Sequence, residues 1–271
     1  MTVKTALQQG SILLEEGQIL APRLTAEVLL AYALRKERVY LFTYPETELG
    51  QIAWLHYGRY LSERLNGKPT QYITKRQEFY GRDFTVSPQV LIPRPETELL
   101  VAAALLLKGR IVDVGTGSGA IAITLSLEKQ QRILALDISA AALAIAGQNA
   151  RTLKANVDFV EGDLLNAVAN RSMDAVVSNP PYISEKDRAQ MQREVRDYEP
   201  HLALFAGPTG TEIYHRLIAG AARVLKPGGH LLLELGYDSL PAVRALLDES
   251  WTEISVTDDL AGIPRVLSAR H

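Results

Sequence analysis

The sequence contains no cysteine among its 271 residues. This absence excludes disulfide bonds, thiolate-bound zinc and cysteine nucleophiles, and it fits a reducing cytosol. The histidines are His56, His201, His215, His230 and His271. Their spacing is not that of metal ligands, so we predict no metal centre. The sequence motifs of nucleophile-elbow hydrolases and P-loop enzymes are also missing.

Strong charge of one sign and long apolar runs are lacking as well. The formal net charge is −2, and proteins that coat nucleic acid usually carry a basic excess, so we expect no direct nucleic-acid partner. The longest apolar run, Leu99–Leu107, is too short to cross a bilayer, and the N-terminus shows no secretory signal pattern. We therefore expect a soluble, cytoplasmic protein with no membrane partner.

The composition that is present, 47% hydrophobic and 22% charged, is that of a globular chain with one large domain or two smaller ones. Apolar residues recur at helical spacing through residues 1–66, and Gly17 is expected to end the first helix. Residues 67–92 contain strand formers, Tyr72 and Ile73 among them, interrupted by Gly81 and Pro88, which is typical of a hairpin. These patterns predict an N-terminal helical domain (1–66), a hairpin linker (67–92) and a second domain (93–271).

The second domain alternates between short apolar runs and helical patterns. The runs predicted as strands are Ile111–Val114, Ile133–Leu136, Val157–Val160, Ala175–Val177 and Leu231–Leu235. Strands separated by helices form a parallel sheet with helices on both faces. We therefore predict an α/β, Rossmann-like fold, in which ligands bind beyond the carboxyl ends of the strands.

A glycine-rich turn runs from Asp113 to Gly119, after the first predicted strand and before a helix. Its glycines allow a ligand to approach the backbone closely. The spacing of Gly115, Gly117 and Ala120 also satisfies the dinucleotide fingerprint, so the turn is compatible with NAD. Two features favour S-adenosylmethionine: the third glycine, Gly119, and the acid Asp113, which could meet the ligand's amino group. A tight turn without a ligand is the structural alternative.

Acidic residues follow the next two predicted strands. Asp137 ends one of them, where a carboxylate can accept hydrogen bonds from both ribose hydroxyls. It could instead cap the following helix, a role for which Ser139 competes. Asp163 and Leu164 follow the third strand, where they could bracket an adenine or form a solvated turn. The later acidic stretch 194–199 is expected to form a solvated lid or helix face.

The element Asn179-Pro180-Pro181-Tyr182 follows the fourth predicted strand. The two prolines fix the backbone and remove two N–H donors, so carbonyl oxygens dominate this edge. Asn179 adds a side-chain acceptor, and Tyr182 offers a flat face to a planar group. The element suits a nitrogen that carries two hydrogens, such as an amide or an exocyclic amine. A rigid turn at the end of a strand is the structural alternative.

These motifs resemble those of class I S-adenosylmethionine-dependent methyltransferases and, more narrowly, of the bacterial release factor glutamine methyltransferases. The narrower resemblance also rests on Leu91–Glu98, Tyr198–Pro200, Leu225–Gly229 and Leu233–Gly236. Arg94–Glu98 is the most specific part, because Asn-Pro-Pro-Tyr also occurs in adenine methyltransferases. The sequence departs from the family at Lys75, where glycine is common, and at Ile263-Pro264, which replaces a usual charged pair.

The resemblance implies a seven-stranded sheet, a helical domain that docks peptide chain release factors, and methylation of the side-chain nitrogen N5 of the glutamine in their Gly-Gly-Gln motif. It thereby implies a protein that modulates translation termination, with S-adenosylmethionine as cofactor and S-adenosylhomocysteine as product. The candidate cofactor-binding residues are Asp113, Gly115, Thr116, Gly117, Ser118, Gly119, Asp137, Asp163, Leu164 and Asn179. The candidate substrate-binding residues are Asn179, Pro180, Pro181 and Tyr182, of which Asn179, Pro180 and Tyr182 are also candidate catalytic residues.

Three other functions remain compatible with parts of the sequence. An adenine-N6 methyltransferase of DNA or RNA shares the Asn179–Tyr182 element, but it would be expected to carry a basic target-recognition region. An NAD-dependent oxidoreductase would leave that element unexplained. A non-catalytic module that keeps the cofactor fold is disfavoured because the motif set is intact.

Overall fold

The computed structural model describes all 271 residues, which fold into two compact units. Unit 1 consists of Met1–Arg76 together with Gln192–Tyr198, and unit 2 consists of Gln77–Met191 together with Glu199–His271. No pattern in the sequence signals that residues 192–198 join unit 1. Two side-chain contacts accompany this membership: Glu194 forms an ion pair with the buried Arg64, and the Tyr198 hydroxyl donates to the backbone carbonyl of Asn66.

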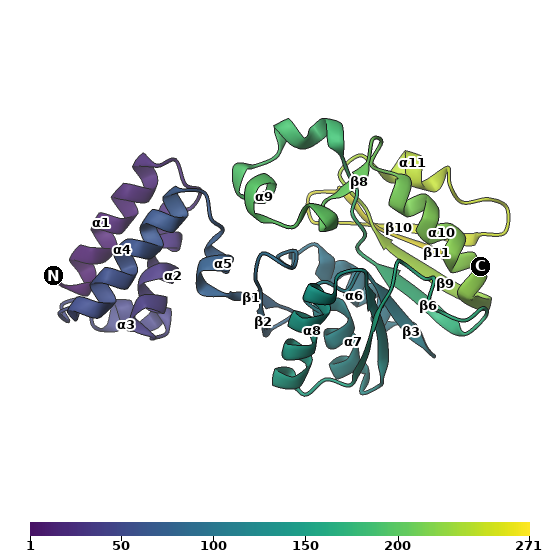
Figure 1. Cartoon of the computed structure of the whole chain (residues 1–271), viewed down its shortest axis with the longest axis horizontal. Coiled ribbons are helices and arrows are strands. Elements are labelled where there is room, and N and C mark those ends of the chain that lie inside the picture. Colours follow the sequence, from purple (N-terminus) through teal and green to yellow (C-terminus); the bar gives the residue numbers. More distant parts are fainter. The chain divides into compact units, whose positions relative to one another are not determined.

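Unit 1 is a bundle of helices (Figure 1). The helices are α1 (Val3–Glu16), α2 (Pro22–Leu34), α3 (Arg38–Thr43), α4 (Gln51–Leu65) and α5 (Thr70–Thr74), with α9 (Arg193–Tyr198) from the returning segment. The Thr2 hydroxyl accepts a hydrogen bond at the start of α1, and Gly17 ends that helix as its position predicted. Leucines spaced along α1, α2 and α4 are buried together, so the helical periodicity read from the sequence marks the core of this unit.

The predicted hairpin is shorter than expected. It consists of β1 (Arg76–Phe79) and β2 (Arg82–Thr85). Tyr72 and Ile73, which the sequence suggested as strand formers, lie instead in α5, and that assignment was wrong. Both side chains are buried, and this packing outweighs the local strand preference. Lys75 ends α5 in the left-handed conformation, with φ of 59°, which explains why glycine suits this position.

Unit 2 is built on a seven-stranded sheet with the order β10-β11-β9-β6-β3-β4-β5. The strands are β3 (Ile111–Val114), β4 (Ile133–Asp137), β5 (Val157–Glu161), β6 (Met173–Ser178), β9 (Leu225–Glu234), β10 (Thr252–Asp258) and β11 (Pro264–Arg270). Only β11 runs antiparallel to its neighbours. The predicted α/β fold with seven strands is confirmed. The order reverses at β3, so the carboxyl ends of β3, β4 and β6 frame a crevice in which open α/β sheets bind ligands.

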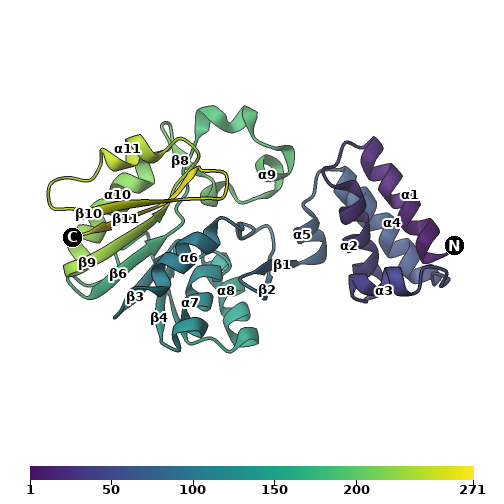
Figure 2. The same ribbon diagram turned by 180° about the vertical axis from the view of Figure 1, so that it is seen from behind.

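Helices cover both faces of this sheet (Figure 2). On one face pack α6 (Thr97–Leu105), α7 (Ala120–Lys129) and α8 (Ala140–Leu153), and on the other pack α10 (Glu212–Val224) and α11 (Leu240–Arg244). Alternate strand residues supply the two cores: Val112 and Val114 pack with α10, whereas Ile111 packs with α6 and α7. None of the helices combines the length and apolar composition needed to cross a membrane.

The remaining elements of unit 2 lie between β6 and α10. They are β7 (Ile183–Ser184), paired with β8 (Phe205–Gly207), and two 3₁₀ turns, η1 (Glu185–Gln190) and η2 (His201–Ala203). This part of the chain follows the Asn-Pro-Pro-Tyr element, so it leads away from the carboxyl end of β6 and returns to the same end of the sheet (Figure 1).

Candidate active site

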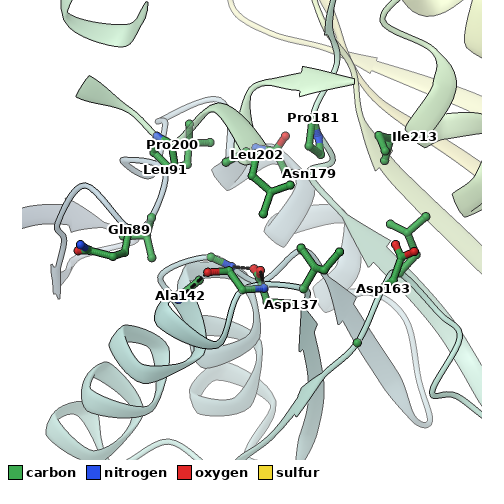
Figure 3. Close-up of a pocket in the computed structure, with 18 of the residues that line it drawn as sticks. Gln89, Leu91, Asp137, Ala142, Asp163, Asn179, Pro181, Pro200, Leu202 and Ile213 are labelled. Carbon is green, nitrogen blue, oxygen red and sulfur yellow. Dashed lines mark hydrogen bonds between the residues drawn. The ribbon is translucent and has the colours of Figure 1, made fainter. Parts of the chain in front are cut away.

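A pocket opens at the carboxyl ends of the central strands of unit 2 (Figure 3). Its lining includes seven of the candidate site residues: Gly115, Gly117, Asp137, Asp163, Leu164, Asn179 and Pro181. The structure thus gathers residues from four separate segments, each of which follows a strand. The other candidates, Asp113, Thr116, Ser118, Gly119, Pro180 and Tyr182, do not line the pocket.

The glycine turn forms one wall of the pocket through its backbone. Gly115 and Gly117 adopt positive φ angles of 74° and 56°, which favour glycine. A Cβ atom added to either residue would meet no atom within 4 Å, so it would project into open space. Gly119 has a different role, because a Cβ atom there would lie 2.7 Å from the Ile123 side chain. Two of these glycines therefore leave room for a ligand, and the third allows α7 to begin.

Asp113 lies beneath the turn and not in the pocket. Its carboxylate is fully buried, accepts a hydrogen bond of 2.6 Å from the Thr116 hydroxyl and another of 3.2 Å from the Ala122 amide. Both hydrogen bonds fall on Oδ2, whereas Oδ1 has no hydrogen-bond partner, so the expectation that Asp113 meets the ligand's amino group stays a prediction. Burial raises the pKa of Asp113 to about 7, and the two hydrogen bonds oppose that rise.

Buried Asp113 predicts a dependence of stability on pH. Its folded-state pKa, about 7, lies above the ordinary carboxyl value, so the folded chain binds more protons than the unfolded chain between about pH 4 and 7. The contribution is full below that window and is lost as the pH rises through about 7. Each pH unit in the window removes up to about 1.4 kcal/mol. Urea unfolding at several pH values should show this slope in the wild type and a smaller one in Asp113→Asn. Equal slopes in the two proteins would contradict the assignment.

Asp137 organises the floor of the pocket. One carboxylate oxygen accepts a hydrogen bond from the Gly117 amide at 2.8 Å, and the other accepts one from the Ser139 amide at 2.9 Å. Ser139, and not Asp137, caps α8, because the serine hydroxyl accepts from the Ala142 amide. The competition seen in the sequence is therefore decided in favour of Ser139. Burial raises the pKa of Asp137, whereas its backbone hydrogen bonds lower it.

Apolar side chains form the walls beside Asp137. Leu164, with a positive φ of 50°, comes from the segment after β5, Ile138 follows β4, and Leu202 reaches in from η2. In Figure 3, Leu202 lies across the pocket from Asp137. Asp163 also lines the pocket, but its carboxylate is engaged by Arg216 of α10 in an ion pair. The apolar walls suit a flat heterocycle, and Asp137 suits hydroxyl groups.

The Asn179–Tyr182 element divides its residues between the pocket and the core. Asn179 and Pro181 line the pocket, whereas Pro180 is buried. The Asn179 side-chain nitrogen donates a hydrogen bond of 3.2 Å to the Thr97 hydroxyl. The Tyr182 ring packs against Gly236, where a Cβ atom would lie 2.7 Å from it. Tyr182 is half-buried and does not line this pocket, so the expectation that its ring offers a flat face to a planar group stays a prediction.

The acidic stretch 194–199 is only partly the solvated helix face that its charge suggested, because Asp197 of α9 is exposed but Glu199 is not. Glu199 is 4% exposed and forms an ion pair of 2.6 Å with Arg94, and Ile92 donates its backbone N–H to the same carboxylate. This contact joins the segment that carries Leu91 to the segment that carries Leu202. Both leucines line the pocket, so Glu199 holds two parts of its wall together.

Several residues of the site carried no recognisable signal in the sequence. Ile213 and Arg216 of α10 line the pocket but belong to no motif. Asn149 of α8 is buried, donates to the carbonyls of Ser118 and Thr85, and so fixes the glycine turn against β2. A single polar residue in an otherwise apolar helix face is the only hint of this role. No group of three or more His, Asp or Glu side chains is arranged to hold a metal.

Known proteins match both units of the chain. Residues 5–74 match the PrmC N-terminal domain, and residues 95–202 match the Methyltransferase small domain. The release factor glutamine methyltransferase of Koribacter versatilis is 47% identical, with coverage of 100% of this chain and 99% of the relative. The chain belongs to the release factor glutamine methyltransferase family.

Other members of the release factor glutamine methyltransferase family agree over the full length. The enzyme of that name from Nitratidesulfovibrio vulgaris is 41% identical, with coverage of 100% of this chain and 95% of the relative. The predicted resemblance and the predicted methyltransferase class are confirmed. The class uses S-adenosylmethionine, which fits the open glycine turn and the carboxylate of Asp137.

Solved structures share the fold over most of this chain at low identity. A methyltransferase from Pyrococcus furiosus has a TM-score of 0.52 at 21% identity and covers 79% of this chain and 98% of its own. The catalytic domain of hMettl16, in complex with a MAT2A 3'UTR hairpin, has a TM-score of 0.57 at 18% identity and covers 77% and 81%. These similarities show a shared fold.

Proposed function

We propose that this protein transfers a methyl group from S-adenosylmethionine to the side-chain amide nitrogen of the glutamine in the Gly-Gly-Gln motif of peptide chain release factors, and so modulates translation termination. The observation that carries the proposal is the joining, in one pocket, of Gly117 and Asp137 with Asn179 and Pro181. A cofactor site and an amide-accepting site lie side by side in a chain that matches release factor glutamine methyltransferases over its full length.

The residues of the pocket fit the cofactor in three ways. The backbone at Gly115 and Gly117 leaves room for its amino-acid end, Asp137 offers oxygens to the ribose, and Ile138, Leu164 and Leu202 line the walls beside the adenine. Bound S-adenosylmethionine supplies an electrophilic methyl group on a sulfonium. No contribution from a metal is needed in this proposal, because the methyl group is already activated.

The chain's own task is to hold a weak nucleophile. The lone pair of an amide nitrogen is shared with its carbonyl, which is why rotation about the C–N bond meets a barrier of roughly 18–20 kcal/mol. The Asn179 side-chain oxygen and the Pro180 carbonyl are proposed to accept the two N–H groups of the substrate amide. Held in this way, the nitrogen lone pair is directed toward the methyl carbon, and positioning supplies much of the rate. Formation of the C–N bond would break the C–S bond of the sulfonium, leave S-adenosylhomocysteine as product, and release one proton from the amide nitrogen to water or a nearby oxygen. Tyr182, packed on Gly236, then acts by fixing the element in place.

Transfer of a tritium-labelled methyl group tests the proposal directly. The wild-type chain should label an unmodified release factor in stoichiometric amount, and replacement of the target glutamine in the factor should abolish labelling. Duplex DNA and transfer RNA serve as competing substrates in parallel reactions. Labelling of nucleic acid without labelling of the release factor would favour the adenine-N6 methyltransferase and overturn the proposal.

If the N-terminal helices dock the release factor, their removal should leave cofactor binding intact but slow methyl transfer to the release factor. A variant that begins at Gln77 keeps every residue that lines the pocket. It should bind S-adenosylmethionine with affinity close to that of the full chain but methylate the intact release factor at least tenfold more slowly, because the docking surface is gone. Calorimetry and filter-binding rates provide the two readouts. Equal rates on the intact factor would remove the docking role from residues 1–66.

A further inference from the structure

Asn179 is held at its nitrogen by Thr97, a residue of the Arg94–Glu98 run that was not among the candidate site residues. Thr97, the first residue of α6, is 4% exposed and accepts the hydrogen bond of 3.2 Å from the Asn179 amide group. An amide that donates through its nitrogen on one side presents its oxygen on the other. The Thr97 hydroxyl, having accepted this bond, has its own hydrogen to donate elsewhere.

A buried carboxyl lies where that hydrogen can go. Glu234 ends β9, the neighbour of β6 in the sheet, and the pairing of Leu233 with Ser178 sets Glu234 beside Asn179. Glu234 is 3% exposed, and its carboxyl lies near enough to the Thr97 hydroxyl for that hydroxyl to lower its pKa. The Oε2 atom of Glu234 has no hydrogen-bond partner. Burial of a carboxyl oxygen without a hydrogen-bond partner costs free energy, so a functional role would explain the position of Glu234.

The ionisation of Glu234 decides the direction of this hydrogen-bond chain. A carboxylate only accepts, so it makes the Thr97 hydroxyl donate to it and accept from the nitrogen of Asn179. A protonated carboxyl can donate to Thr97, which then donates to the Asn179 oxygen and turns the nitrogen toward the pocket. Only the first arrangement presents an acceptor to an incoming N–H group.

The surroundings of Glu234 act on its charge in both directions. Burial raises the pKa of Glu234 to about 7, and the negative charge of Glu96 adds to that rise. The pKa is lowered by a hydrogen bond from Thr97 and by the positive charges of Arg265 and Arg94. Tyr182 and Tyr214 complete its titratable surroundings, since the charge of Glu234 raises the pKa of each tyrosine. The balance leaves both protonation states of Glu234 accessible near neutral pH.

We propose that Thr97 and Glu234 are positioning residues for methyl transfer, which turn the Asn179 amide so that its oxygen, and not its nitrogen, faces the substrate. This inference rests on the proposed role of Asn179 as an acceptor for the glutamine amide. Neither residue lines the pocket, so both would act through Asn179 alone.

Valine at position 97 gives the sharpest kinetic test, because it keeps the shape of threonine and removes the hydroxyl. Thr97→Val should lower the single-turnover rate at saturating cofactor by about tenfold or more, with cofactor affinity unchanged, and Thr97→Ser should recover most of the rate. Thr124→Val is the matched control, since Thr124 is also a buried helical threonine of unit 2 and its hydroxyl has no partner. Its rate should equal that of the wild type.

Glutamine at position 234 tests the direction of the hydrogen bonds that link Glu234, Thr97 and Asn179. The single-turnover rate of the wild type should rise with pH through about 7, as Glu234 ionises, and Glu234→Gln should lose this rise and remain slow. The double variant Thr97→Val/Glu234→Gln should be little slower than the slower single variant, because both changes interrupt the same series of hydrogen bonds. A wild-type rate in Thr97→Val, or an unchanged pH profile in Glu234→Gln, would overturn the inference.

A readout without activity keeps this inference separate from the proposed function. In ¹⁵N–¹H spectra of the full chain, the side-chain NH₂ signal of Asn179, identified by its loss in Asn179→Asp, should shift with pH near 7 and respond to Thr97→Val. It should not respond to Thr124→Val. A signal indifferent to Thr97 and to pH would refute the positioning role even if the protein methylates release factors. A responsive signal in a protein that labels no release factor would refute only the proposed function.

Discussion

Replacement of Asn179 by alanine is expected to slow methyl transfer by about ten- to a hundredfold or more. The substitution removes one of the two acceptors proposed for the glutamine amide, and a hydrogen bond that gains charge in the transition state contributes roughly 1.5–3 kcal/mol. Because the bond strengthens as the nitrogen becomes positive, the loss should fall on the chemical step and not on substrate affinity. Single-turnover transfer to a release factor at saturating cofactor measures it.

Aspartate at position 179 separates the oxygen of the side chain from its nitrogen. Aspartate keeps acceptor oxygens but loses the donor to Thr97, and it places a second carboxyl close to buried Glu234. We therefore expect Asn179→Asp to be no faster than Asn179→Ala. Partial rescue by aspartate would mean that a simple acceptor is sufficient at this position.

A control variant shows that the effect is local. Asn156 is an exposed asparagine immediately before β5 and does not line the pocket, so Asn156→Ala should transfer at the wild-type rate. If Asn179→Ala also keeps the wild-type rate, Asn179 is structural, and the chemistry proposed for the Asn179–Tyr182 element fails.

Loss of the Asp137 carboxylate is expected to weaken cofactor binding by tenfold at least and by about a hundredfold if both ribose hydrogen bonds are lost. The structure adds a second reason, because the same carboxylate holds the Gly117 amide at 2.8 Å. Asp137→Ala therefore removes a ligand contact and releases one wall of the pocket. Calorimetry with S-adenosylmethionine gives the affinity, and circular dichroism verifies the fold.

Two further variants sharpen the interpretation of Asp137. Asp137→Asn keeps one acceptor oxygen and should lose less affinity than Asp137→Ala. Asp158→Ala, on the neighbouring strand β5, removes a half-exposed carboxylate whose ion-pair distance to Arg132 is 3.5 Å, and it should leave the affinity unchanged. An Asp137→Ala variant that is folded and binds the cofactor normally would refute the ribose assignment.

The contact between Arg94 and Glu199 illustrates how the motifs of this family act together. Arg94 belongs to the most family-specific run of the sequence, and Glu199 to a second family segment more than a hundred residues later. Their ion pair connects the chain segments that carry Leu91 and Leu202 to the pocket. Each of the two family segments therefore supplies half of one structural contact beside the pocket.

The hairpin and the N-terminal helices show where local patterns were sufficient and where they failed. The end of α1 at Gly17 followed from the sequence, since a helix cap depends on neighbouring residues only. Tyr72 and Ile73 were assigned to a strand because of their side-chain type, yet both are buried in a short helix. Burial against residues distant in sequence overrides a preference that is worth only about 1 kcal/mol.

The sequence by itself determined the alternation of strands and helices, the glycine turn, the acid after the second strand and the Asn-Pro-Pro-Tyr element. These features depend on the spacing of residues along one segment, so they can be read from that segment alone. Parallel strands then require their carboxyl ends to meet, which is why Gly117, Asp137, Leu164 and Asn179 could be expected in one place before the structure was known.

Only the tertiary structure decided which side chains face the ligand and which hold the site from behind. Asp113 is buried beneath the glycine turn, the half-buried Tyr182 packs against Gly236, and Glu199 is a buried partner of Arg94. Thr97 and Glu234 lie beside Asn179 although 137 positions separate them in the sequence. The physical reason is that burial, ion pairing and the direction of a hydrogen bond depend on neighbours brought by other elements, and no local pattern contains them.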